Sequence, residues 1–156
     1  MSPAHPLGGR ATWLADARRA YGRARFTEAK ATIDAAEASF GLPAEAVLLR
    51  VRVLLKRDAG AALADLEVHR AALAGEAVRA EAQMLAGAAY ARLGDHASAE
   101  ARFRSAERHC SPRSPLVAEI GYQRAQALWM ERRLDEAEVE LERIEHRASG
   151  TLEIEC

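Results

Sequence analysis

Apolar residues recur at helical spacing through residues 80–106, AEAQMLAGAAYARLGDHASAEARFRSA, on both sides of a short Leu93-Gly94-Asp95 break. Each half places small residues beside one large residue on a single side of the predicted helix. These positions are, in chain order, Ala86, Gly87, Tyr90, Ala99, Phe103 and Ala106. Because small residues opposite large ones let two helices approach closely, the stretch predicts an antiparallel helix hairpin.

The same pattern occurs four times and accounts for nearly the whole chain. The repeats span about 10–42, 43–75, 76–112 and 114–148, and their starts near residues 10, 43, 80 and 118 are separated by 33, 37 and 38 residues. Residues 1–9 predict a flexible N-terminal segment, rich in Pro and Gly. We expect residues 149–156 to form either a tail or the start of a further helix of a longer protein.

The second repeat departs most from the pattern. Arg50 replaces the small residue of its first helix, and His69 replaces the final alanine of its second helix. Asp58 nevertheless stands in the same phase as Asp95 of the third repeat. Both aspartates are predicted to cap the second helix of their hairpin, where the first backbone N–H groups have no helical partner.

The spacing resembles the tetratricopeptide repeat (TPR), W-x2-L-G-x2-Y followed by A-x3-F, whose period is about 34 residues. In the third repeat Gly87, Tyr90, Ala99 and Phe103 match that pattern, whereas Gln83 stands in the Trp place. This resemblance implies an all-α fold, an α-solenoid of about four stacked antiparallel hairpins in a right-handed superhelix. It also implies a concave surface lined by the first helix of each hairpin.

The resemblance further implies a non-catalytic scaffold that binds a protein or peptide on this concave face, with aromatic and Met contacts dominating. The partner-binding residues carried over are Leu14, Arg18, Tyr21, Met84, Arg92, Tyr122, Gln126, Trp129 and Met130. Val47 and Val51 fall on the same side, but as buried aliphatic residues they favour a core role. Some members hold a partner's C-terminal carboxylate with Lys, Asn and Arg; the chain has no Asn, and only Lys30 and Lys56, so we do not expect that clamp.

An alternative follows from the same resemblance. Bacterial transcription regulators of the LuxR type join such arrays to a C-terminal helix-turn-helix, so the chain could be a ligand-sensing or regulatory domain of a larger bacterial protein. The Ala- and Arg-rich composition favours a bacterial source. These residues contain no visible DNA-reading helix, and we expect no direct nucleic-acid contact from them.

Composition and charge narrow the classes of function. The 156 residues are 49% apolar and 29% charged, with a net charge of −1, so no global field attracts nucleic acid or an anionic membrane. The chain lacks the apolar run of a signal peptide or a membrane span, and its two cysteines form no motif. We therefore expect a cytoplasmic protein with reduced thiols, although one disulfide stays open as an alternative.

The sequence contains no phosphate-binding glycine loop, no H-E-x-x-H and no C-x-x-C, and its five histidines are scattered. We therefore expect no enzyme, no catalytic residue, no cofactor and no metal site. Charge is distributed unevenly, because the first hairpin is basic and the last is acidic. Self-association through these opposite ends is a further hypothesis.

Overall fold

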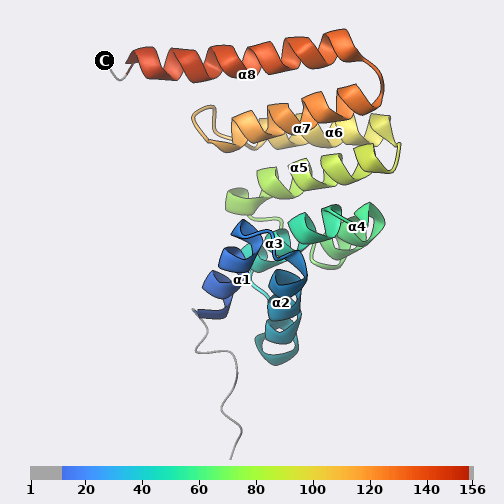
Figure 1. The fold of residues 1–156 in the computed structure, drawn as a ribbon, viewed down its shortest axis with the longest axis vertical. Helices are drawn as coiled ribbons and strands as arrows, with labels where there is room; N and C mark the ends of the chain where they lie inside the picture. Colours follow the sequence, from blue (N-terminus) through green and yellow to red (C-terminus); the bar gives the residue numbers. More distant parts are fainter. Residues whose placement is uncertain (1–11, 155–156) are drawn as a thin grey trace, which may run out of the picture. The chain divides into compact units, whose positions relative to one another are not determined.

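The computed structural model describes residues 12–154, with side chains up to residue 150, and within that range it contains eight α-helices and no strand (Figure 1). The predicted all-α class is confirmed. The helices are α1 (Thr12–Gly22), α2 (Phe26–Phe40), α3 (Ala44–Leu55), α4 (Ala59–Val68), α5 (Glu76–Arg92), α6 (His96–Arg108), α7 (Leu116–Met130) and α8 (Leu134–Ile154). Across the described part of the chain, no helix has the length and apolar character that crossing a membrane would need.

The chain divides into two compact units between Leu73 and Ala74. In the first unit α1 packs on α2 and α3 packs on α4, and both α1 and α2 also contact α3. In the second unit α5 packs on α6 and α7 packs on α8, while α7 also contacts α5 and α6. Each unit therefore consists of two packed helix pairs with a short turn inside each pair.

Three of the four turns have the same backbone geometry. Ala24, Gly94 and Arg132 follow α1, α5 and α7 with positive φ angles of 58°, 81° and 64°. The next residue in each turn donates its N–H to a carbonyl five residues earlier, at 2.9 to 3.0 Å. This left-handed residue with a six-to-one hydrogen bond closes the helix end and reverses the chain.

The residues that directly precede the second helices are Arg25, Asp58, Asp95 and Arg133. Their separations of 33, 37 and 38 residues equal those of the predicted repeats. Asp58 accepts a hydrogen bond from the Ala61 N–H at 2.9 Å, and Asp95 accepts one from the Ser98 N–H at 3.1 Å. Both predicted caps are confirmed.

Small residues face large ones closely in both pairs of the second unit, at Gly87 against Phe103 and at Gly121 against Ile144. Gly87 faces the Phe103 ring, and a Cβ atom built at Gly87 would lie 2.8 Å from the ring's Cε1 atom. In the first unit Ala29, Ile33 and Ala36 of α2 are fully buried. Val47 and Val51 are fully buried as well, which confirms the core role that their aliphatic character favoured.

The last helix is longer than the sequence predicted. The fourth repeat was expected to end near residue 148, before a tail or a new helix, but α8 continues without a break to Ile154. The Ser149-Gly150 pair does not end it, and the Ser149 hydroxyl donates back to the Glu145 carbonyl at 3.0 Å, inside the helix.

Candidate functional site

One face of α7 exposes large side chains that the sequence assigned to partner binding. Tyr122, Trp129 and Met130 are 57%, 64% and 38% exposed, and Gln126 between them is exposed too. Their spacing of four, three and one residues places all four on one side of the helix. The opposite side of α7 is anchored in the core through Ile120 and its buried neighbours. The helix therefore presents an aromatic surface to solvent.

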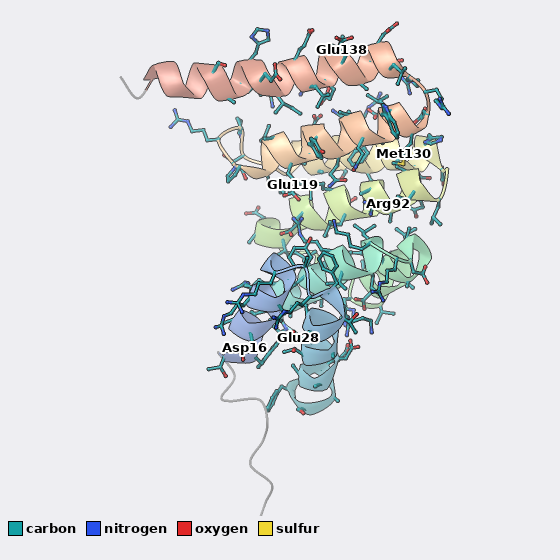
Figure 2. All side chains as sticks on the ribbon, in the orientation of Figure 1. Asp16, Glu28, Arg92, Glu119, Met130 and Glu138 are labelled. Carbon is teal, nitrogen blue, oxygen red and sulfur yellow. The ribbon has the colours of Figure 1, made fainter. Side chains whose placement is uncertain are left out.

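Arg92 stands at the corresponding place on the neighbouring helix. It lies in the last turn of α5, as Met130 does in α7, and the two residues lie at the same end of these packed helices (Figure 2). Burial lowers the pKa of the Arg92 guanidinium below its usual value. Arg92 therefore matches Met130 in its place on the helix.

The other predicted residues do not join this surface. Met84 is fully buried, so its assignment to an accessible face is wrong. The physical reason is that nine residues of α5, spread around its circumference, are buried, and a helix covered on all sides offers no open face.

The three predicted residues of the first unit form a separate group. Leu14 packs against the core around Trp13, and Tyr21 packs on Phe26 with ring centroids 5.4 Å apart. Both side chains are half-buried, whereas Arg18 is exposed. Leu14 and Tyr21 therefore serve the packing of α1.

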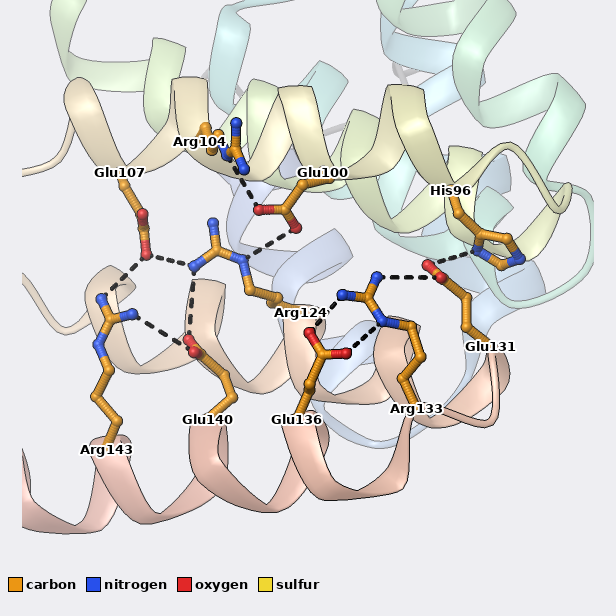
Figure 3. A network of polar contacts seen from close by, with 10 residues as sticks. All are labelled: His96, Glu100, Arg104, Glu107, Arg124, Glu131, Arg133, Glu136, Glu140 and Arg143. Carbon is orange, nitrogen blue, oxygen red and sulfur yellow. Dashed lines mark hydrogen bonds and ion pairs between the residues drawn. The ribbon is translucent and has the colours of Figure 1, made fainter.

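A buried arginine on α7 organises the polar side of the second unit (Figure 3). Arg124 is nine-tenths buried, and its Nη1 atom lies 2.7 Å from Glu107 and 3.6 Å from Glu140, while its Nε atom lies 3.4 Å from Glu100. Arg143 from α8 reaches the same Glu107 at 3.3 Å. The cluster links α6, α7 and α8 through charge-assisted contacts.

The first unit contains a second cluster of this kind. Arg50 on α3 is buried and donates two hydrogen bonds of 2.8 Å to Asp65, one of 3.1 Å to Asp34, and two to Glu37. His69 lies against the same acids, with its Nε2 atom 3.2 Å from Glu37. The two departures from the repeat pattern, Arg50 and His69, thus meet in one polar cluster.

The acids of the two clusters occupy matching positions. Glu37 lies twelve residues after Arg25, and Glu107 lies twelve residues after Asp95. Each glutamate belongs to the helix pair that precedes the pair of its arginine. In the arginine's own pair, Asp65 lies seven residues after Asp58, and Glu140 lies seven residues after Arg133. In each unit, therefore, a buried arginine with one acid from the preceding helix pair and one from its own pair joins the two pairs.

Electrostatics favours the charged forms in both clusters. Burial alone would raise the pKa of Glu107, but the hydrogen bond and the charge of Arg124 outweigh it, and the pKa lies below the usual value. The hydrogen bond from Arg50 lowers the pKa of Glu37 in the same way. Burial opposes the charge of Arg50 and Arg124, yet their carboxylate partners raise the pKa of both guanidinium groups above the ordinary range.

An open cleft of about 550 Å³ lies over the Arg124 cluster. Its walls carry the acids Glu100, Glu107, Asp135, Glu136 and Glu140, the bases Arg104, Arg124 and Arg133, and the apolar Leu128 and Val139. Most of these charges already contact an opposite charge within the protein. The arrangement is therefore suited to stabilising the packed helices. Among the residues described, no three His, Cys, Asp or Glu side chains are grouped as metal ligands.

Sequence reasoning missed both arginine clusters. Arg50 stood out as a substitution for a small residue, but its acids come from two other helices, 13 to 16 residues away in the chain. The usable signal was the matching phase of Glu37 and Glu107 in repeats one and three.

Comparison of the chain with protein-family models, with curated proteins and with solved structures gives no match.

Proposed function

We propose that the protein is a non-catalytic binding scaffold, a TPR-like solenoid of four helix hairpins, that holds a protein or peptide partner on the exposed face of α7. The observation that carries the proposal is this face, where Tyr122, Trp129 and Met130 project from a helix whose other side is anchored in the core. Aromatic and Met side chains supply much of the energy at protein interfaces. The shared geometry of three of the four turns and the matching intervals of the pairs support the repeat architecture.

The partner segment that fits this face is apolar, in the form of an amphipathic helix or an extended peptide. A surface of two aromatic rings and one thioether gains free energy by burial against apolar side chains, at about 25 cal/mol per Å².

Capture of partners by the immobilised protein tests the proposal. Trp129→Ala and Tyr122→Ala should each greatly reduce recovery of a specific partner, because each removes an exposed anchor. Since both side chains are exposed, we expect the free energy of unfolding to change by no more than about 0.5 kcal/mol. Val68→Ala is the matched control, because Val68 is an exposed apolar residue on α4 and belongs to the other unit.

Tryptophan fluorescence gives a second measurement on the captured partner. Trp13 is 3% exposed and Trp129 is 64% exposed, so a soluble quencher acts mainly on Trp129. Binding of the partner should protect Trp129 from the quencher. Equal recovery of all partners by the wild type and the two variants, or unchanged quenching in the complex, would refute the proposed face.

A further inference from the structure

The last helix carries an exposed stripe of alternating apolar and acidic residues. Leu134, Glu138, Leu141 and Glu145 follow one another at intervals of four, three and four residues, which places them on one side of α8. Leu134 and Leu141 are 53% and 42% exposed, and both glutamates are exposed. In the part of the chain that the structure describes, neither glutamate side chain has an ion-pair partner. Glu138 lies on the side of α8 away from α7 (Figure 2).

The acids of the corresponding stripe of α6 contact an arginine of the next helix. His96, Glu100, Phe103 and Glu107 each precede their counterpart in α8 by 38 residues. Glu100 and Glu107 both face Arg124 of α7, and Phe103 is only 1% exposed (Figure 3). His96 lies 3.0 Å from Glu131, the residue that follows α7. α7 thus contacts both acids of the stripe, while Phe103 between them is buried against Gly87 of α5.

The first unit repeats this arrangement. In α2 the stripe is Phe26, Lys30, Ile33 and Glu37, and α3 packs against the helix. Glu37, in the place of Glu107 and Glu145, pairs with Arg50, and Ile33 is fully buried. Lys30 stands at the position of Glu100, so the second carboxylate on Arg50 comes from Asp34, whose Oδ1 atom accepts a hydrogen bond from Arg50 at 3.1 Å. Acidic residues at these positions are not a general property of the second helices. The same positions in α4 and the turn after it hold no acid; they are Ala59, Leu63, Leu66 and Arg70.

We propose that the α8 stripe docks a helix of a partner protein that carries one arginine among small and apolar residues. The charge of the stripe favours an arginine on the partner helix. Glu138 and Glu145 are seven residues apart, the same separation as that of Glu100 and Glu107, which both contact Arg124. A planar guanidinium reaches both acids at once, which a lysine ammonium does not do with the same geometry. This surface is separate from the proposed α7 face and does not depend on it.

A second copy of the chain does not supply such a helix through α1. The positions of α1 that align with Arg124 and Arg50 are Asp16 and Ala17, nine and eight residues before Arg25. Asp16 would bring a negative charge against the two glutamates, and its carboxylate already pairs with Arg19 at 3.2 Å. α1 of a second copy is therefore not the helix that the stripe fits.

A peptide of residues 115–131, which contains Arg124, is the probe for this docking site because α7 supplies the arginine that contacts the equivalent acids of α6. Anisotropy of the labelled peptide titrated with the full chain should show saturable binding. The variant Glu138→Gln with Glu145→Gln should weaken binding about tenfold or more, because both charge-assisted contacts are lost. The peptide with Arg124→Gln should bind equally weakly to wild type and variant.

Two protein variants serve as controls. Glu45→Gln with Glu76→Gln removes the same charge at exposed first-turn positions of α3 and α5 and should leave peptide binding unchanged. Trp129→Ala should also leave it unchanged, which separates this site from the α7 face. No saturable binding, or equal binding by wild type and the Glu138/Glu145 variant, would overturn the proposal. A dimer of the chain alone in sedimentation, lost in that variant, would overturn it in favour of a second copy.

Discussion

Gly87 shows how a single side chain sets the distance between two helices. The backbone of α5 passes so close to the Phe103 ring that the place of a Cβ atom is already occupied, with three ring atoms within 3.1 Å of it. The ring is fully enclosed, so it has little room to move away. Glycine at this position therefore follows from contact with α6 and not from the conformation of the α5 backbone.

Gly87→Ala should destabilise the second unit by about 1 to 3 kcal/mol, because the added methyl group overpacks the α5–α6 contact. Gly22→Ala is the matched control, since Gly22 also lies in a helix and an added Cβ meets nothing within 4 Å. That change should be neutral or stabilising by up to about 1 kcal/mol, as alanine favours the helix. Urea unfolding of the three proteins measures the difference; equal midpoints for Gly87→Ala and the wild type would contradict the close packing.

At the scale of the element, the turns of three helix pairs share one left-handed residue but fill it with different amino acids. Gly94 occupies it without steric cost, whereas Ala24 and Arg132 carry a Cβ atom at positive φ. The six-to-one hydrogen bond and the packing of the two helices therefore impose the turn geometry. The residue type changes only the free-energy cost of the positive φ angle.

Substitutions at this position should change the free energy of unfolding in opposite directions in two of the turns. Ala24→Gly relieves left-handed strain and should stabilise the first unit by up to about 1 kcal/mol, less the extra entropy of glycine in the unfolded chain. Gly94→Ala should destabilise the second unit by about 1 kcal/mol for the reverse reason. Thermal unfolding followed by circular dichroism measures both. A loss of stability in Ala24→Gly would show that the unfolded-state entropy outweighs the strain.

At the scale of the whole molecule, each unit is joined internally by one buried arginine and its acids. Breaking a buried pair by removing one partner costs roughly 3–5 kcal/mol in general, although the partial exposure of Glu37 and Glu107 reduces that figure here. The two clusters make the stability of both units depend on ionised carboxylates.

Stability should therefore fall in acid. The folded-state pKa values of Glu37 and Glu107 lie below 4.5, the ordinary value that applies to the unfolded chain, so folding favours their charged forms. Their contribution is fully present above pH 4.5 and is lost as the pH falls through the lower folded-state values. Urea unfolding between neutral pH and about pH 3 measures the loss. The double variant Glu37→Gln with Glu107→Gln should start less stable and lose less in acid; an equal loss would assign the acid sensitivity to other groups.

The sequence by itself determined the helices, their pairing and their caps. Apolar spacing, the Leu93-Gly94-Asp95 break and the phase of Asp58 and Asp95 are local signals, and helix position depends mainly on local chemistry. Of the residues that it assigned to partner binding, those on α7 are exposed, whereas Met84 is fully buried. The TPR resemblance, the solenoid and the binding partner stay predictions.

Only the tertiary structure decided which helix faces are covered. Met84 and Trp129 have equally apolar side chains on first helices, yet one is fully buried and the other is mostly exposed. The sequence marks Arg50 only as a replacement for a small residue and does not single out Arg124, yet other helices enclose both side chains and supply their acids. Periodicity along one helix fixes which residues share a face, whereas burial depends on the neighbours that the fold brings to it.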